Sequence, residues 1–267
     1  MIRFFLFLLP ILSFADGLPL FWWKDGPETN FGDYLSLKLI ERIIEQPTCY
    51  VNHVPKQKKL LAIGSIFFFA RNGDVIWGSG INGKTLNQND YVFTDLDVRS
   101  VRGPKTREFL WENFGIVAPE IYGDPALLFP YFFPEFKKSA SPQYDYIIIP
   151  HYKDKKLFPK SNDPHIIYPT DPWNEVIEKI LNSRFVISGS LHGIVLAESY
   201  GIPARYLRVT EAENIFKYQD YYLGTGRAHF EYATSVEEAL MMGGEEPFSC
   251  DLQKIYEAFP FDYWPKK

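Results

Sequence analysis

The sequence predicts an α/β protein in which two parallel-sheet domains face one another. Three observations predict this class: short apolar segments alternate with helical segments, most apolar segments end in glycine-rich or polar turns, and a proline- and aromatic-rich stretch separates an earlier from a later series. Segments apolar at three or more consecutive positions suit strands covered on both faces, as in parallel sheets. The 267 residues suffice for one large domain or two smaller ones.

The earlier series begins with a strand at Leu18–Trp23 and a helix at Tyr34–Glu45, whose apolar residues follow helical spacing. A second helix starts at Pro104 and stops at Gly115, the residue types that favour a helix start and a helix end. Three further apolar runs are strand candidates, at residues 60–63, 75–77 and 98–101.

Residues 130–143 contain three prolines and several aromatic residues, so we expect them to form the crossing between two halves. Beyond it we expect strands at 144–152, 165–169, 185–188 and 204–209, helices at 173–181 and 191–200, and a terminal helix within 251–264 that packs across the domain junction. The predicted domains are 17–138 and 139–267, the second carrying the segment Ser-Gly-Ser-Leu-His-Gly.

Residues 1–16 have the layout of a secretory signal or an anchor: one arginine, an apolar run from Phe4 to Phe14, and small residues near Ala15. The run is short for a membrane span of about 20 residues. This interpretation places the protein in the secretory pathway or at a membrane. The alternative is a cytoplasmic protein in which these residues form an extension or a first hydrophobic strand.

Composition argues against several classes of protein. The net charge of −5 gives no basic excess for nucleic acid, and the one basic run, Lys56–Lys59, is short enough to be a solvated loop. Cys49 and Cys250 are the two cysteines, too few for a thiolate metal site, although a single bridge between them stays open. The five histidines are scattered, so no metal ligand spacing stands out.

Candidate functional residues lie where predicted strands end. In open α/β sheets, ligands bind in the crevice outside the carboxyl ends of the strands, so these segments should converge. They are Asn30–Asp33, Gly78–Gly80, Arg102–Pro104, His151–Lys153 and Ser188–Gly193.

The segment Ser188-Gly189-Ser190 precedes a helix that starts at Leu191. Small residues before a helix N-terminus let a phosphate approach the free backbone N–H groups and the positive end of the helix dipole. His192 lies in the first turn, where its charge would respond to a bound anion, and this makes it a candidate general acid or base. Simple capping or packing is the competing interpretation of His192.

The other candidates each have a structural alternative. Arg102 could bind a carboxylate or phosphate through two nitrogens, or form a surface ion pair. Asn30 and Asp33 could face the crevice or cap a helix, and Ser79 and Asp124 could face it or belong to turns. His151 and Lys153 follow a very apolar strand and should face the crevice, unless they belong to a solvated loop.

Taken together, six segments resemble the polysaccharide pyruvyltransferase family. They appear in order from about Trp22 to Val209, and the last is the most specific. They are NFGD (30–33), GSG (78–80), SVRGPKTRE (100–108), YGDPALL (122–128), IIIPHY (147–152) and SGSLHGIVLAESYGIPA (188–204).

The resemblance implies two Rossmann-like domains in a GT-B-like arrangement. It also implies transfer of pyruvate from phosphoenolpyruvate to two hydroxyls of a sugar in a glycan or a glycolipid-linked acceptor, forming a ketal, with no cofactor. By resemblance, Arg102 and His192 form the donor site, and Ser190, Leu191 and Gly193 present backbone to the phosphate. No motif after Val209 defines an acceptor site.

Two rival functions remain open. The first is a GT-B sugar-nucleotide glycosyltransferase, which would also use a helix start that binds phosphate. The second is a non-catalytic glycan-binding protein, in which residues 131–136 or Tyr218, Tyr221 and Tyr222 stack on sugars, although these aromatic residues could equally fill the core.

Overall fold

The computed structural model describes residues 17–24, 29–52, 57–211 and 213–267. The predicted signal segment, residues 1–16, therefore lies outside the described residues. The described chain forms two sheets whose paired strands are all parallel, one with five strands and one with four. The α/β prediction with two parallel sheets is confirmed.

The first sheet has the strand order β2-β1-β3-β4-β5. Its strands are β1 (Leu18–Phe21), β2 (Thr48–Tyr50), β3 (Leu60–Leu61), β4 (Val75–Trp77) and β5 (Asp97–Ser100). Helices α1 (Phe31–Ile44) and α2 (Pro104–Phe114) accompany it, and α2 ends at Gly115 as predicted. The short β2 was not predicted, because its residues show no apolar run; Thr48 and Cys49 are partly buried and Tyr50 is exposed.

The second sheet has the order β6-β7-β8-β9. Its strands are β6 (Ile147–Ile149), β7 (Val186–Ser188), β8 (Ala204–Leu207) and β9 (Tyr232–Ala233). Its helices are α4 (Trp173–Leu181), α5 (Leu191–Ser199), α6 (Phe216–Gly224) and α7 (Val236–Met242). Helix α3 (Phe129–Phe132) and the loop after it connect the two sheets.

The strand predicted at 165–169 is wrong, because only a single bridge between Ile148 and Ile166 forms there. Two neighbouring aspartates accept hydrogen bonds from backbone N–H groups of this segment, and Pro169 has no N–H to extend a ladder. Asp163 accepts from His165 N at 2.8 Å, and Asp171 accepts from Tyr168 N at 2.8 Å. Such side-chain turns compete with sheet pairing, so the segment folds as two turns.

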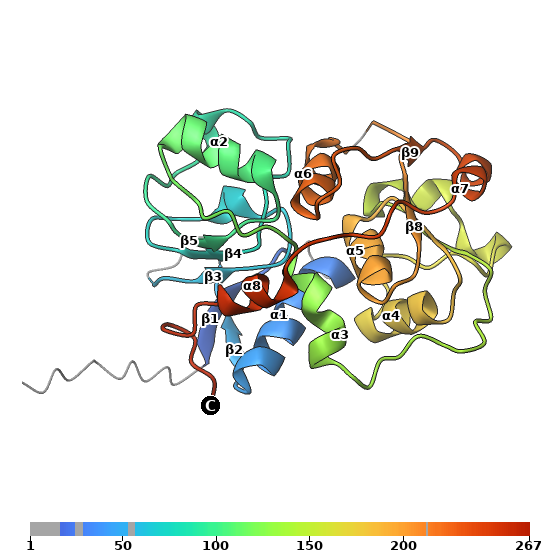
Figure 1. The fold of residues 1–267 in the computed structure, drawn as a ribbon, viewed down its shortest axis with the longest axis horizontal. Helices are drawn as coiled ribbons and strands as arrows, with labels where there is room; N and C mark the ends of the chain where they lie inside the picture. The colour runs from blue at the N-terminus through green and yellow to red at the C-terminus, as the bar shows by residue number, and fades with distance from the viewer. Residues whose placement is uncertain (1–16, 25–28, 53–56, 212) are drawn as a thin grey trace, which may run out of the picture.

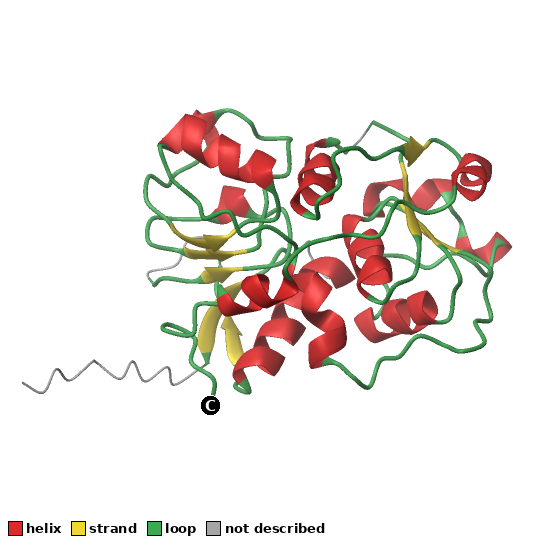
Figure 2. Ribbon diagram, viewed as in Figure 1, coloured by secondary structure: helices red, strands yellow, loops and turns green. Residues whose placement is uncertain are grey.

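One apolar cluster lies between the two sheets and includes residues from both halves of the chain. Helices α1, α3 and α5 occupy this central layer (Figures 1 and 2). The apolar stripe of α1 predicted from spacing is fully buried there, as are the apolar residues of α5. Smaller clusters cover the outer face of each sheet.

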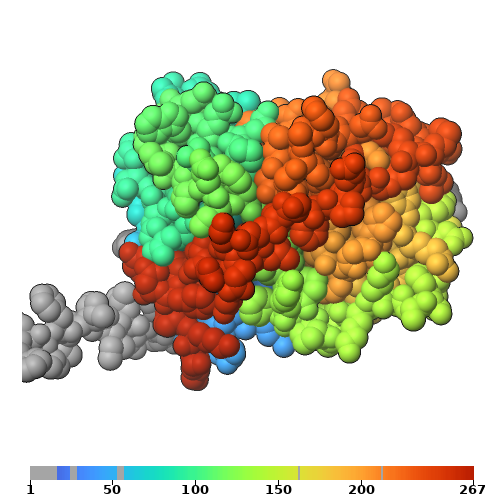
Figure 3. Space-filling model, in the orientation of Figure 1, coloured from blue at the N-terminus to red at the C-terminus, as the bar shows by residue number. Residues whose placement is uncertain are grey.

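The C-terminal segment crosses from the second half to the first (Figures 1 and 3). Its helix, α8 (Leu252–Glu257), is shorter than the helix predicted within 251–264. It packs across the junction, because Trp77 Nε1 donates to Ile255 O at 2.7 Å and the Trp77 and Phe259 rings lie 4.9 Å apart. At the end of the chain, Lys267 N donates to Ile44 O at 3.0 Å.

Three further findings concern predicted features. Cys49 and Cys250, both within the described residues, form no disulfide with each other. Lys59 does not belong to a solvated loop: it is buried and forms an ion pair with Asp74. None of the helices in the described residues is long and apolar enough to cross a membrane.

Candidate active site

A cavity of about 230 Å³ lies where the carboxyl ends of strands from both sheets meet. It is lined by residues that follow β1, β3, β4, β6, β7 and β8, as expected for the ligand crevice of open α/β sheets. The first half contributes Trp23, Asn30, Asp33, Ser65, Ile66, Phe69, Asn82 and Lys84; the second contributes His151, Tyr152, Ser190, Leu191, His192, Glu213 and Lys217.

Six of the predicted site residues line this cavity: Asn30, Asp33, His151, Ser190, Leu191 and His192. The other five do not. Arg102, Ser79 and Asp124 are fully buried behind the wall, Gly193 packs against Ser188, and Lys153 is exposed on the loop after β6.

The N-terminus of α5 reaches the cavity at Ser190. Ser188 fixes the turn before it, because its hydroxyl accepts from Ser190 N at 3.0 Å and donates to Ser190 O at 2.7 Å. The Ser190 side chain makes no capping bond to the helix. The first N–H groups of a helix have no partner within it, so this end favours an anion.

The His192 ring lies at the junction of the two halves. Its Nε2 lies 3.6 Å from Asp124 Oδ2, and a Cβ on Gly32 would lie 2.0 Å from its Nδ1. Gly32 therefore admits the imidazole, and any other residue would displace it. Among the described residues, neither His192 Nε2 nor Asp124 Oδ2 finds a hydrogen-bond partner.

Asp33 lines the cavity in the first turn of α1, near His192. Burial raises the pKa of this carboxyl to about 6, and the positive charges of His192 and Lys217 offset only part of that effect. A carboxyl with this pKa exchanges protons near neutral pH, as a general acid or base must. Asn30 both lines the cavity and caps α1, since its Oδ1 accepts from Gly32 N at 2.9 Å.

Arg102 is placed differently from the prediction. It is fully buried, and its guanidinium contacts Asp220 Oδ2 at 3.1 Å, Ile81 O at 2.7 Å and Ser65 Oγ at 2.5 Å. Ser65 lines the cavity, so Arg102 lies directly beneath the wall. The alternative of a surface ion pair is also wrong, because both partners of the ion pair are buried.

The glycine turn Gly78–Gly80 has a packing explanation. A Cβ on Gly80 would lie 2.3 Å from Cζ of Arg102, so the glycine leaves room for the guanidinium. Ser79 Oγ donates to Gly64 O at 2.9 Å and is turned away from the cavity. Asp124 also has a capping role, because its Oδ1 accepts from Ala126 N at 3.0 Å.

Glu213 and Lys217 were not found from the sequence, although both line the cavity. The Glu213 carboxylate lies 2.5 Å from Lys84 Nζ, 2.9 Å from His151 Nε2 and 3.7 Å from Lys217 Nζ. These partners lower the pKa of Glu213 below its usual range, although burial opposes the shift. Burial lowers the pKa of Lys217 to about 8, which Glu213 partly opposes.

The His151 ring is held in one tautomer. Burial lowers the pKa of His151 below its usual value, so the imidazole is neutral at pH 7. Its Nδ1 accepts from Lys153 N at 3.4 Å, and its Nε2 therefore carries the proton donated to Glu213. Lys153 thus contributes its backbone to His151, while its side chain is exposed.

The tyrosines considered as sugar-stacking residues are buried. Tyr218, Tyr221 and Tyr222 are each fully buried in the central apolar cluster. The core-filling interpretation is the right one for these three residues. Within the described ranges, no group of three or more His, Cys, Asp or Glu side chains is arranged to hold a metal ion.

A helix N-terminus that favours an anion and a carboxyl with a pKa of about 6 thus line one cavity at the ends of two parallel sheets. The polysaccharide pyruvyl transferase family matches residues 30–210, and the chain belongs to this family. The family predicted from six sequence segments is confirmed.

Two relatives match most of the chain. It is 30% identical over 193 residues to the uncharacterized protein L143 of Acanthamoeba polyphaga mimivirus, covering 68% of this chain and 64% of that protein. It is 28% identical over 214 residues to the succinoglycan biosynthesis protein ExoV of Rhizobium meliloti (strain 1021), covering 76% of this chain and 63% of ExoV. The chain thus spans just under two thirds of each relative.

A solved structure is also similar. It is the crystal structure of a functionally uncharacterized protein, KP1_0663, from Klebsiella pneumoniae subsp. pneumoniae NTUH-K2044, with a TM-score of 0.49 and 11% sequence identity. The match covers 83% of this chain and 94% of that chain.

Proposed function

We propose that the protein transfers the pyruvyl group of phosphoenolpyruvate to two hydroxyls of a sugar residue and forms a pyruvate ketal. One observation carries the proposal: a single cavity joins the N-terminus of α5 to a carboxyl with a pKa of about 6. Family membership and the similarity to ExoV support a transferase of polysaccharide biosynthesis.

In this proposal the donor phosphate binds at the start of α5, at the backbone N–H group of Leu191 and beside the Ser190 side chain, because the Ser190 N–H is already bonded to Ser188 Oγ. Gly193 lets this first turn pack against Ser188. Lys84 and Lys217 supply positive charge for the remaining charges of the donor, since both line the same cavity. His192 contacts the phosphate and transfers a proton. Arg102 positions Ser65 and the wall from beneath rather than touching the donor, because it is fully buried.

The reaction proceeds in two additions. Protonation of the donor methylene makes the central carbon electrophilic, and a first sugar hydroxyl attacks it and loses its proton. The C–O bond to phosphate then breaks, and a second hydroxyl attacks the same carbon. The two hydroxyl protons are balanced by one on the new methyl group and one on the phosphate or a base, so the products are the ketal and inorganic phosphate.

Asp33 is suited to accept the proton of the attacking hydroxyl. With a pKa of about 6 it is mostly ionised at pH 7, yet it is a stronger base than an exposed aspartate. His192, in the opposing half of the molecule, is suited to deliver the proton to the methylene. One well-placed acid or base is worth roughly 10²–10⁴ in rate.

The size of the cavity favours this donor over a nucleotide sugar. Its volume of about 230 Å³ is below the range of about 300–1,000 Å³ that is common for drug-sized ligands. Phosphoenolpyruvate is far smaller than a nucleoside diphosphate sugar. We propose that residues 17–138 and 139–267, each built around one sheet, form the two domains of a GT-B-like enzyme. Its donor would be phosphoenolpyruvate in place of the larger nucleotide sugar.

Two experiments test the function. The first is incubation with phosphoenolpyruvate and a panel of galactosides, glucosides and mannosides, measuring product mass and released phosphate. The second is a thermal-shift comparison: we expect stabilisation by phosphoenolpyruvate and none by a nucleotide panel. The reverse pattern would favour glycosyl transfer, and sugar binding without product in the presence of donor would favour a non-catalytic lectin.

A further proposal concerns the cellular location of the protein and is based on residues 1–16. We propose that they direct the protein into the secretory pathway or hold it at a membrane, as the layout of a signal segment indicates. Sequencing the N-terminus of the protein purified from its native cells tests this. A chain that begins at Met1 and is recovered in the cytoplasm would contradict it.

A further inference from the structure

Trp23 and Phe69 form a stacked aromatic pair in the wall of the cavity. Their ring centroids lie 4.9 Å apart with an interplanar angle of 26°. Trp23 follows β1 and Phe69 ends the short helical turn Phe67–Phe69 after β3, and these two strands are neighbours in the first sheet. We call this pair the aromatic wall. Trp23 keeps 37% of its surface exposed.

The charged groups of the cavity are unevenly distributed. The lining residues that follow β1 and β3 in the described chain include no basic side chain; the ionisable group among them is the carboxyl of Asp33. The lysine and histidine side chains of the lining follow β4 or come from the second half, and they are Lys84, His151, His192 and Lys217. The Glu213 carboxylate lies among them, but two lysines and the N-terminus of α5 leave this side the more positive one. A polyanionic donor therefore prefers this side and leaves the aromatic wall uncovered.

The aromatic side of the cavity suits a ligand with both apolar and polar faces. A pyranose ring presents C–H groups on one face and hydroxyls around its edge, and C–H groups pack favourably on an aromatic surface. Asn30 retains two N–H donors on its amide, since its Oδ1 is the atom bonded to Gly32 N. Asp33 accepts hydrogen bonds from hydroxyls, and both residues line the cavity.

We propose that the aromatic wall is the acceptor subsite, in which an uncharged pyranose stacks on Trp23 and turns two adjacent hydroxyls toward Asn30 and Asp33. This inference rests on the proposed function, because it assigns the second substrate of that reaction. It places the acceptor in the first half of the chain, whereas the donor phosphate binds the second half at α5. The two hydroxyls then face the donor across the cavity.

The test uses three variants of the full chain. Trp23→Ala removes the stacking surface, Trp23→Phe keeps an aromatic ring, and Trp111→Ala is the matched control. Trp111 is a 59% exposed tryptophan on α2 that does not line the cavity. Thermal melting first establishes that each variant is folded.

We expect Trp23→Ala to raise the acceptor KM by about tenfold, the scale of a lost aromatic contact, while the KM for phosphoenolpyruvate changes less than twofold. Trp23→Phe should recover most of the loss, and Trp111→Ala should match the wild type. Equal acceptor KM in Trp23→Ala and the wild type would overturn the proposal. So would a parallel rise in both KM values, which would indicate a general distortion of the site.

A binding measurement separates this inference from the proposed reaction. Saturation-transfer NMR with methyl glycosides, without phosphoenolpyruvate, should show sugar contact in the wild type and lose it in Trp23→Ala. If the wild type fails to turn over phosphoenolpyruvate but binds sugar through Trp23, the subsite stands and the reaction does not. Equal signals in the wild type and Trp23→Ala, or no signal from any glycoside at millimolar concentration, would overturn the subsite.

Discussion

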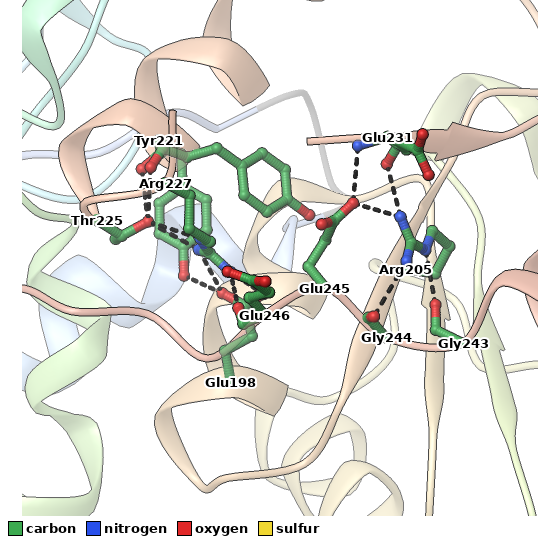
Figure 4. A network of polar contacts seen from close by, with 11 residues as sticks. Glu198, Arg205, Tyr221, Thr225, Arg227, Glu231, Gly243, Gly244, Glu245 and Glu246 are labelled. Atoms are coloured by element: carbon green, nitrogen blue, oxygen red, sulfur yellow. Dashed lines mark hydrogen bonds and ion pairs between the residues drawn. The ribbon is translucent and has the colours of Figure 1, made fainter. Parts of the chain in front are cut away.

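The molecule contains two buried polar regions that differ in how completely their side chains are paired: one lies within the second half of the chain, and the other lies where the two halves meet at the cavity. In the network of Figure 4, Arg227 binds both oxygens of Glu198 at 2.7 and 2.9 Å, and Tyr221 donates to the same carboxylate at 2.6 Å. Arg205 donates to the carbonyls of Gly243 at 2.7 Å and Gly244 at 3.0 Å and pairs with Glu245.

The active-site region is incompletely paired by comparison. His192 Nε2, Asp124 Oδ2 and Arg102 Nε are buried without a hydrogen-bond partner in the described chain. Asp33 has a raised pKa because its own partners do not offset burial. A buried polar group without a partner costs free energy, so each such group needs an explanation. Of the incompletely paired groups, His192 and Asp33 line the cavity, where the proposed function supplies a ligand for them, whereas Arg102 and Asp124 lie behind its wall.

The largest expected effect is on catalysis. His192→Ala should lower kcat by about 10²–10⁴, the scale of a lost acid or base, and should leave the melting temperature nearly unchanged. Phosphate release in the presence of phosphoenolpyruvate and acceptor measures this. The control is His229→Ala, an exposed histidine outside the cavity. Near-normal turnover by the His192 variant would rule out its assigned role.

A substitution in the network of Figure 4 should lower the stability of the protein rather than its catalytic activity. Arg227→Met leaves the buried Glu198 carboxylate without its ion-pair partner, and breaking such a pair costs about 3–5 kcal/mol. Urea denaturation measures the free energy of unfolding. Arg184→Ala, which breaks an exposed pair with Asp145, should change it little. If Arg227→Met lowers the free energy of unfolding no more than Arg184→Ala does, the network does not stabilise the fold.

Asp33→Asn should lose activity and gain stability. The pKa of Asp33 is about 6 in the folded protein, whereas that of an exposed aspartate in the unfolded chain is about 3.9. Between these pH values the unfolded chain ionises first, so wild-type stability falls as pH rises from about 4 to 6. Above pH 6 the variant should be more stable by on the order of 2 kcal/mol, and below pH 4 the difference should vanish.

Paired chemical denaturations of Asp33→Asn and the wild type at pH 4 and pH 7.5 measure this difference. Asp97→Asn is the control, because Asp97 is ion-paired with Arg99 outside the cavity. A variant that is less stable than the wild type at pH 7.5 would contradict the burial of an uncompensated carboxyl at position 33.

The smallest expected effect concerns Glu213, whose carboxylate pairs with the charged Lys84 and Lys217 and accepts a hydrogen bond from the neutral His151. Glu213→Gln removes this negative charge and should lower the KM for phosphoenolpyruvate by a few-fold at low salt, with a smaller change at high salt. Glu211→Gln is the control, because Glu211 is exposed and pairs weakly with Arg208 at 3.8 Å. A higher KM in Glu213→Gln would show that the carboxylate orders the site rather than opposing the donor.

Local pattern was sufficient for the elements with strong periodicity or clear end signals. Strand β4 and helix α4 have the predicted bounds, and α2 runs from Pro104 to the residue before Gly115. The rule that ligands bind at carboxyl ends of strands placed Asn30, Asp33, His151 and Ser190–His192 at one cavity. Each of these predictions could be made from residues that are close together in the sequence.

The remaining features depend on partners distant in the sequence. Arg102 follows a strand, as a ligand-binding arginine would. It forms a buried ion pair with Asp220 instead, and no residue near Arg102 in the sequence indicates that partner. Helix α6 was missed because its aromatic and charged residues form no clear apolar stripe, so no predicted element placed Lys217 or Glu213, which lies just before the helix. Trp23 was predicted to belong to the first strand, but that strand ends at Phe21. Its position in the cavity wall was therefore not predicted.

The most direct test is a single incubation of the purified protein with phosphoenolpyruvate and the panel of galactosides, glucosides and mannosides. We expect one inorganic phosphate for each pyruvyl ketal formed on a sugar, with both products absent when His192→Ala replaces the wild type. Phosphate release without sugar modification, or sugar modification that requires a nucleotide sugar and ignores phosphoenolpyruvate, would contradict pyruvyl transfer at this cavity.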